Sequence, residues 1–547
     1  DDASRRNLIK LQSLYESCMD EKKMSEVGVK PLTDLVQKMI KVFPGTSSAD
    51  REEMALAISQ LASVGVAALV DFDVDSDPKN PDQNVLRLGE DGLGLPSKQY
   101  YDEEKIMAVY LKTVEEMFEI VMGNKDNGQK DGQAMKKPPI VWAEVAKNVV
   151  EFEKLLAAIS SDPEDLENSE LTYNPHTLSQ ITELIPLIDW SLALEKLLGA
   201  GSPTPDPIIV SMPEYLEKLN ALLKETPAMT LQNYFAWKLI QKLSLNLAVE
   251  YRKPMQQLRA ALQGVSADLV TPRWETCIDV VDNGLGAMAG HYFIEKTFKG
   301  DSKEMADGII TSLRSSFVKG LSHLEWLDKA TFQNATEKVD LLIQKIGYSI
   351  ESPDVRSPEA LEEYYKDLGV DKVDFFGNQI RTRTWGTQQV LSELGKPVDK
   401  AKWLMSPQTV NAYYNPSLNE IVFPAGILQQ PFFHGNNPEY LNYGGIGVVA
   451  GHELTHAFDN EGRLFDAHGK LSDWWSNSTL QEFKERSQCF INQYGNFTVK
   501  DPQGRENHVN GKLTLGENLA DNGGYGSLAA FFMNIMSIVK KKWIESY

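Results

Sequence analysis

One short run carries the residue types best suited to chemistry: His452 and His456 stand in the pattern H-E-x-x-H, with Glu453 between them. On an α-helix, residues four apart lie on one face, so both imidazoles can reach the same metal ion. Histidines at this spacing are typical zinc ligands, and zinc activates water for hydrolysis. Glu453 lies beside that face and can take a proton from the water without occupying a coordination position. The pattern predicts a zinc-dependent hydrolytic site, and a surface helix with two solvated histidines is the alternative.

A catalytic zinc ion usually needs a third protein ligand. Glu517 and Asp521 are again four residues apart, within the segment Gly516–Gly524. On a second helix packed against the first, Glu517 could bind the metal, and Asp521 could accept the other ring N–H of a zinc histidine and fix its tautomer. Such acidic pairs are often solvated helix faces, but the surrounding Gly and Asn residues indicate close packing. Asp459 is a weaker candidate for the supporting role.

The elements that must position these residues follow from length and periodicity. A chain of 547 residues exceeds what one core ordinarily supports, so two or more lobes are expected. Apolar residues recur at three- and four-residue steps through most of the first 390 residues, which predicts helices. Thr409–Tyr414 and Asn419–Phe423 alternate polar and apolar residues and predict two strands joined by a turn. An edge strand beside the zinc helix would offer main-chain groups to an extended peptide.

Other segments carry structural predictions only. The Asp-, Asn- and Pro-rich stretch Asp73–Asn84 is predicted as a loop, Asn124–Pro139 as a mobile surface loop, and Leu178–Leu198 as one helical segment. The apolar run Leu528–Val539 is interrupted by polar residues and predicts a buried helix. The aromatic residues predicted to lie in the core are Phe235, Trp237 and Trp274. The histidines predicted to lie on the surface, away from the motif, are His434, His468 and His508.

The acidic composition disfavours two classes of binding partner. The net charge is −22, from 55 Lys and Arg against 77 Asp and Glu, and 42% of the residues are hydrophobic. This is the composition of an ordinary soluble globular protein. An acidic surface of this size disfavours nucleic acid and anionic membrane as partners. No apolar run approaches the length of a membrane span, so no membrane contact from this chain itself is expected.

Five blocks together resemble the neprilysin and endothelin-converting-enzyme family of zinc metalloendopeptidases. They are Asn411–Tyr414, Ile421–Leu428, Asn442–Gly447, the H-E-x-x-H motif and Gly516–Gly524. Their order and spacing match the family, which is far more specific than the zinc motif alone. The resemblance implies a mainly α fold with a small β-sheet, in which two lobes enclose a central cavity and the catalytic core is similar to thermolysin. Residues 1–390 would form a mostly helical lobe with some segments crossing over, and 391–547 the zinc lobe without its C-terminal part.

The resemblance also implies roles for individual residues. One Zn²⁺ per chain would be held by His452, His456 and Glu517, and the catalytic residues would be Glu453, as general base, and Asp521, through its bond to a zinc histidine. Asn411 and Ala412 resemble positions that hold the substrate backbone, and the alternative for Asn411 is a turn or strand-end residue. Positions that resemble the pocket for the residue after the scissile bond, and that could equally be core, are Ile427, Phe432, Val448 and Val449.

The function predicted is zinc-dependent endoproteolysis of short peptides on the amino side of hydrophobic residues. The family implies an extracellular protein, either secreted or the outer domain of a single-pass type II membrane protein. Family members also carry a C-terminal histidine that stabilises the intermediate and an arginine that binds the substrate carboxylate, and neither motif occurs in residues 1–547. A separate C-terminal fragment of the same protein is therefore a possible partner. The alternative function is a catalytically impaired peptide-binding or scavenging protein, while an aminopeptidase is disfavoured because no G-x-M-E-N block occurs.

Three cysteines are present, Cys18, Cys277 and Cys489. The resemblance implies that Cys18 and Cys489 pair with cysteines beyond Tyr547, and the partner usual for Cys277 is absent. Cys277 is therefore predicted to be a buried free thiol. Three Asn-x-Ser/Thr sequons are compatible with a secreted glycoprotein. Their acceptor residues are Asn334, Asn477 and Asn496.

Overall fold

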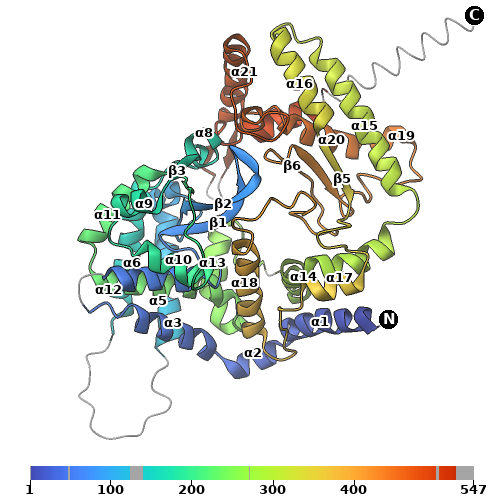
Figure 1. Cartoon of the computed structure of the whole chain (residues 1–547). Coiled ribbons are helices and arrows are strands. Elements are labelled where there is room, and N and C mark those ends of the chain that lie inside the picture. The colour runs from blue at the N-terminus through green and yellow to red at the C-terminus, as the bar shows by residue number, and fades with distance from the viewer. Residues whose placement is uncertain are drawn as a thin grey trace, which may run out of the picture.

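The chain folds into a mainly helical molecule, as the computed structural model in Figure 1 shows, and its described residues form three small sheets. The mainly α class is therefore confirmed. The structure describes residues 2–46, 50–123, 140–269, 271–500, 504–524 and 526. The predicted surface loop Asn124–Pro139 and the predicted buried helix Leu528–Val539 lie outside these residues.

The helices of the first half are mostly amphipathic and follow one another closely. In chain order they are α1 (Asp2–Met19), α2 (Glu21–Val27), α3 (Lys30–Val42), α4 (Arg51–Ala62), η1 (Lys98–Asp102), α5 (Glu104–Met122), α6 (Trp142–Ile159), α7 (Pro163–Leu166), α8 (Ser169–Thr172), α9 (Leu178–Leu184), α10 (Trp190–Leu198), α11 (Pro213–Glu225), α12 (Ala228–Leu243), η2 (Ser244–Asn246) and α13 (Val249–Gln263).

The helices of the second half include the one that carries the zinc motif, α20. In chain order they are α14 (Arg273–Thr297), α15 (Ser302–Leu321), α16 (Lys329–Leu341), α17 (Pro358–Tyr364), α18 (Phe375–Leu391), α19 (Glu439–Gly444), α20 (Ile446–His456), η3 (Gly462–Leu464) and α21 (Asn477–Gly495). Residues 515–524 form a further helical segment.

The strands of the described residues form three separate sheets. Their bounds are β1 (Val70–Asp77), β2 (Asn80–Glu90), β3 (Asn174–His176), β4 (Ile208–Val210), β5 (Ile343–Gly347), β6 (Tyr413–Asn415), β7 (Glu420–Pro424), β8 (Thr498–Lys500) and β9 (Glu506–His508). The strand orders are β1-β2-β4-β3, β5-β7-β6 and β8-β9. The pairs β2–β4 and β5–β7 are parallel and the others are antiparallel. The prediction of two strands at Thr409–Tyr414 and Asn419–Phe423 is confirmed by β6 and β7, although β6 begins only at Tyr413.

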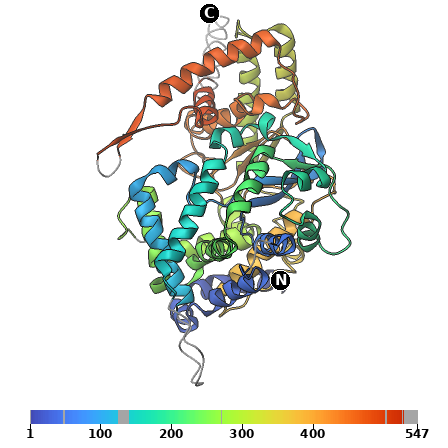
Figure 2. The same ribbon diagram turned by 90° about the vertical axis from the view of Figure 1, so that its left-hand side faces the viewer.

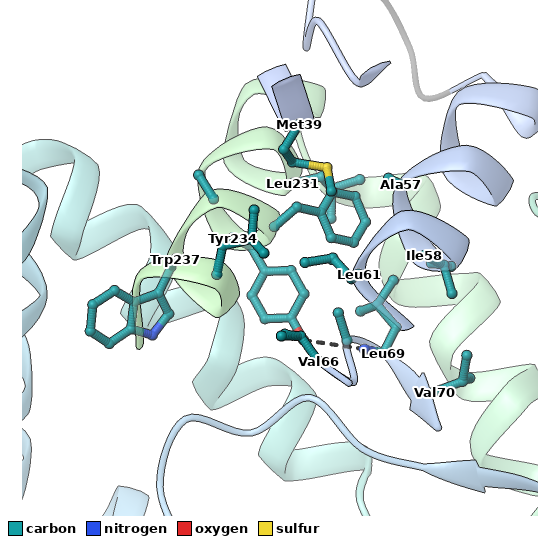
Figure 3. Packing of buried hydrophobic residues seen from close by; sticks show 14 of the residues in the cluster. Met39, Ala57, Ile58, Leu61, Val66, Leu69, Val70, Leu231, Tyr234 and Trp237 are labelled. Atoms are coloured by element: carbon teal, nitrogen blue, oxygen red, sulfur yellow. Dashed lines mark hydrogen bonds between the residues drawn. The ribbon is translucent and has the colours of Figure 1, made fainter. Parts of the chain in front are cut away.

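The larger hydrophobic core is built around α12. Phe235 and Trp237 of this helix are completely buried, so their prediction as core residues is confirmed. Figure 3 shows Tyr234 of the same helix pointing at Leu69, whose backbone N–H donates to the tyrosine hydroxyl at 3.2 Å. The hydroxyl in turn donates to the Gly92 carbonyl oxygen at 2.9 Å. Buried aromatic rings dominate core energetics, and satisfying the buried hydroxyl avoids a desolvation cost.

A second core surrounds the zinc helix. Apolar side chains of α15, α16, β5, β7 and α20 meet there, among them Ile310, Phe423 and Leu454. The helices α15, α16, α20 and α21 lie together at the top of both Figure 1 and Figure 2. Elements that precede residue 390 therefore contribute to the core that supports the zinc helix.

Three predictions of local structure are wrong. The stretch Asp73–Asn84, predicted as a loop, belongs to the β1–β2 hairpin, whose register pairs Val74 with Leu86. The segment Leu178–Leu198 is two helices, α9 and α10, with a break at residues 185–189 that contains a proline. Trp274, in the first turn of α14, is 51% exposed rather than in the core.

The predictions that Cys277 is a free thiol and that Cys18 pairs with a cysteine beyond Tyr547 are also wrong. Cys18 of α1 and Cys277 of α14 form a disulfide, with Cα atoms 5.6 Å apart. The two helices pack against each other and bring the cysteines together within a buried cluster that includes Phe375. Cys489 is free and exposed. In the described part of the chain, no helix is both long and apolar enough to cross a bilayer.

Candidate metal centre

The zinc helix α20 buries one face and presents the motif on the other. Ile446, Ala450 and Leu454 are almost completely buried and pack into the second core. His452 and His456 each follow one of these apolar residues by two positions, which is about 200° around the helix axis. Their imidazoles therefore point away from the core, and both are half-buried. The helical spacing predicted from the sequence is what directs both rings to one side.

The structure brings the two imidazoles and Glu517 together. The Nε2 atoms of His452 and His456 lie 3.0 Å apart, and Glu517 Oε2 lies 3.3 Å and 3.7 Å from them. Zinc bonds of about 2.0–2.1 Å in a tetrahedron would separate neighbouring ligand atoms by about 3.3 Å. One nitrogen from each histidine and one carboxylate oxygen thus form a cluster with dimensions that fit a zinc ion.

Close packing of two helices places Glu517 at this point. A Cβ at Gly523 would lie 2.1 Å from Thr455 Oγ1, and one at Gly524 would lie 2.8 Å from the Val448 carbonyl oxygen. Any larger side chain at these glycines would push the helical segment 515–524 away from α20. The glycines therefore permit the approach that Glu517 needs.

Carboxylates engage the other nitrogen of both imidazoles. His452 Nδ1 lies 2.9 Å from Asp521 Oδ1, and His456 Nδ1 lies 2.6 Å from Asp459 Oδ2. A carboxylate accepts a hydrogen bond from Nδ1–H and so keeps the proton on Nδ1, which leaves the Nε2 lone pair of each ring for a metal ion. Burial lowers the pKa of His456, but the hydrogen bond and charge of Asp459 outweigh it and raise that pKa.

Asp459 is held more firmly than Asp521, the carboxylate that contacts the other histidine. It is only 6% exposed, and its second oxygen accepts the backbone N–H groups of Glu461 and Gly462 at 2.8 Å and 2.7 Å. Asp521, by contrast, has a side chain that is 67% exposed. The sequence ranked Asp521 above Asp459, and the structure gives both the same kind of contact with a histidine.

Glu453 lies in an environment suited to a proton acceptor. It is 5% exposed, and burial raises its pKa to about 7, against the opposing effects of His456 and a backbone hydrogen bond from Tyr414. A carboxylate with a pKa near neutrality can accept a proton and return it within one reaction cycle. Tyr414 belongs to β6, so this strand runs beside the motif.

The positions predicted to bind substrate lie on β6, on α20 and in the second core. Asn411 is exposed just before β6, and its side-chain oxygen accepts the backbone N–H of the buried Ala412 at 2.9 Å. Sheet order places β6 at one end of its sheet. Ile427 is a member of the second core, Phe432 and Val449 pack against that core, and Val448 is half-buried on α20. Their contact with a substrate stays a prediction.

The histidines predicted on the surface, His434, His468 and His508, are exposed and apart from the cluster, so that prediction is confirmed. The sequence analysis missed Lys338, which is completely buried beneath the C-terminal end of α20. No sequence signal marks it, because all its polar contacts are with backbone carbonyl groups far along the chain.

Comparison with known proteins places the chain in a family. Models of peptidase family M13 match residues 1–349 and 411–545. An endothelin-converting enzyme homolog of Locusta migratoria is 35% identical over 94% of this chain and 70% of its own length. The fold is similar to the zinc metalloprotease ZMP1 of Mycobacterium tuberculosis in complex with an inhibitor, with a TM-score of 0.84 and 29% identity over 98% of this chain and 80% of that one. The open state of ZMP1 gives a TM-score of 0.70 at 30% identity over the same shares of the two chains. The chain therefore belongs to peptidase family M13 and is a zinc metalloendopeptidase.

Proposed function

We propose that this chain hydrolyses short peptides at a single zinc site formed by His452, His456 and Glu517. One observation carries the proposal: two ring nitrogens and a carboxylate oxygen converge while each Nδ1 is engaged by another carboxylate. This donor set, with two neutral nitrogens and one carboxylate, is that of known zinc hydrolases. When bound, zinc supplies Lewis acidity toward the peptide carbonyl and lowers the pKa of water.

Glu453 is the general base in this proposal. Its carboxylate takes a proton from the attacking water and then delivers it to the leaving amine nitrogen, so the residue ends the cycle ionised as it began. Its burial supports this role, because a raised pKa makes the carboxylate a stronger base than an exposed one. Asp521 and Asp459 fix the tautomers of the two histidines.

Substrate binding is proposed for the end strand of the small sheet. An extended peptide can add to the outer edge of β6, with Asn411 and Ala412 holding its backbone. Hydrophobic side chains after the scissile bond would be received by a pocket, and the apolar character of its proposed lining supports that preference. The proposed lining residues are Ile427, Phe432, Val448 and Val449.

The proposed division into lobes and the proposed location come from different observations. Residues 1–390 would supply most of the helical lobe and 391–547 the zinc lobe, with α15, α16 and β5 crossing into the zinc lobe.

An extracellular location is supported by the buried disulfide, since disulfides persist in oxidising compartments. The three sequon asparagines, Asn334, Asn477 and Asn496, are all exposed and open to glycosylation.

A peptide assay tests the proposed chemistry. Purified protein is given a quenched fluorogenic peptide with a phenylalanine after the scissile bond, before and after dialysis against a chelator and after zinc is restored. We expect zinc-dependent cleavage and a loss of about 10²–10⁴-fold in kcat for Glu453→Gln, the typical contribution of a general base. His468→Ala, an exposed histidine outside the cluster, is the matched control and should keep full activity. Peptide binding without zinc-dependent turnover would overturn the proposal and favour a scavenging role.

A further inference from the structure

Lys338 is the most deeply buried cation in the described part of the zinc core. It lies on α16 and is 0% exposed. Its Nζ donates to the carbonyl oxygens of Ala457 at 2.8 Å, Gly462 at 2.6 Å and Phe465 at 2.6 Å. A protonated ammonium group has three N–H donors, and each one finds an acceptor here.

The three carbonyl groups belong to the segment that follows the zinc helix. Ala457 is the first residue after α20, and Gly462 and Phe465 bracket the short helix η3. Between them lies Asp459, the residue that holds His456 Nδ1. Lys338 therefore fastens both ends of the segment that carries the histidine's partner.

Other side chains fix the ammonium group in place. The rings of Tyr414, Phe458 and Trp474 surround it, with Nζ 5.6–5.7 Å from each ring centre. Such contacts favour a cation at this point. Asn419 holds the same region from the side, because its amide donates to the carbonyl oxygens of Lys338 and Ala467 at 2.9 Å and 3.1 Å. The lysine is thus one part of a buried polar network.

Simple packing does not account for a lysine here. Burial disfavours its charge and lowers its pKa to about 7. The three acceptors nonetheless require the protonated form, because a neutral amine has only two N–H donors. An apolar side chain of similar length would fill the same space without the desolvation cost.

We propose that Lys338 is a positioning residue for the zinc site, acting on His456 through Asp459. By holding the carbonyl groups of residues 457, 462 and 465, its ammonium group fixes the segment so that the Asp459 carboxylate meets Nδ1. This inference rests on the proposed function, because it concerns the affinity of the three-ligand site for zinc.

The test compares zinc affinity with stability in four variants of the full chain. Zinc Kd is measured by competition with a chromogenic chelator, and the Tm of the metal-free protein is measured separately. We expect Lys338→Met to raise the zinc Kd about tenfold and Asp459→Asn to raise it about 10–100-fold, the range for residues that orient a metal ligand. If the lysine acts through the aspartate, the double variant will bind zinc no more weakly than Asp459→Asn alone.

Lys238→Met is the matched control. Lys238 is also buried and its ammonium group donates to a carbonyl, that of Leu93 at 2.9 Å, but it lies in the other core. This variant should lower the Tm and leave the zinc Kd unchanged. A Lys338→Met protein whose Tm falls while its zinc Kd stays within twofold of wild type would overturn the inference and leave a purely structural role.

Two further outcomes are distinguishable. If Lys338→Met does not fold, the zinc Kd of Lys338→Arg tests the inference instead. The planar guanidinium of arginine keeps the positive charge but cannot direct three N–H donors from one nitrogen. We expect a zinc Kd between those of wild type and Asp459→Asn, and an unchanged Kd would refute the inference. If wild-type protein binds no zinc, the proposed function itself fails, whereas normal wild-type binding with unchanged variants contradicts only the role of Lys338.

Discussion

Glu461 joins the zinc core to the helical lobe through a contact that can be broken selectively. Its Oε2 accepts the backbone N–H of Ser169 at 2.9 Å, at the first residue of α8. Leu471 extends the contact, since it exchanges hydrogen bonds with the β1–β2 turn at Pro78 and Lys79. The fold is more similar to ZMP1 with an inhibitor than to its open state. We therefore expect the Glu461–Ser169 contact to form when the lobes close and to break when they open.

The size of the effect follows from the bonds lost. Glu461→Ala removes the acceptor for the N–H and hydroxyl of Ser169. At about 0.5–1.5 kcal/mol for each hydrogen bond, the closed form should lose about 1–3 kcal/mol, a fall of about 5- to 150-fold in the closed-to-open ratio. KM should rise as the closed fraction falls. Glu461→Gln keeps an acceptor oxygen and should stay close to wild type at pH 5, where the buried carboxyl group of the wild type is protonated.

The same residue predicts a pH dependence. Burial raises the pKa of Glu461 from 4.5 to about 7, with Asp459 adding to the shift and Ser169 and Arg463 opposing it. A carboxyl group whose pKa is higher in the closed form takes up a proton on closing. Closure is therefore most favoured below pH 4.5 and loses that contribution as pH rises through about 7. Glu461→Gln cannot titrate and should abolish this dependence.

Small-angle X-ray scattering from pH 5 to 8, together with KM for a fluorogenic peptide, measures both effects. The control is Glu183→Ala, which removes an exposed glutamate of α9 in the same lobe. The reasoning is refuted if Glu461→Ala leaves the scattering curve and KM unchanged, or if Glu461→Gln opens the molecule as much as Glu461→Ala does.

Three further predictions concern stability and metal binding. Cys277→Ser removes a cross-link between residues 259 apart in sequence. The chain-entropy model sets an upper limit of about 5.6 kcal/mol on the lost free energy of unfolding, and urea denaturation with and without reductant should show a clear loss. Removal of zinc by a chelator should lower the Tm, since zinc at 1,000 times its Kd adds about 4 kcal/mol to the free energy of unfolding. If differential scanning fluorimetry shows no change in Tm on chelation or on zinc addition, the folded protein has no zinc site. Asp521→Asn should raise the zinc Kd by about 10-fold, the low end of the range for such partners, because the side chain is largely exposed; chelator competition measures it, and an unchanged Kd would contradict the role assigned to Asp521.

Sequence reasoning succeeded where a single element encodes the information. The spacing of His452 and His456 fixes their common face on any helix, and the glycines after Glu517 correctly indicated close packing. It failed at the β1–β2 hairpin because acidic residues resembled a loop. In β1 they alternate with Val70, Phe72 and Val74, and that alternation is the stronger signal for a strand. The disulfide was missed because α1 and α14 are far apart in sequence and only the fold brings them together.

The same distinction separates the metal ligands from the residues that hold them. A histidine pair on one helix can be recognised locally, whereas Lys338 reaches carbonyl groups 119 to 127 residues further along the chain. Backbone carbonyls carry no residue identity, so no motif can record such contacts. A search for ligand patterns alone will therefore find the histidines and their carboxylate partners and overlook a residue such as Lys338. Lys338 can be singled out only in the structure, where a completely buried lysine donates to backbone carbonyl groups beside the histidine cluster.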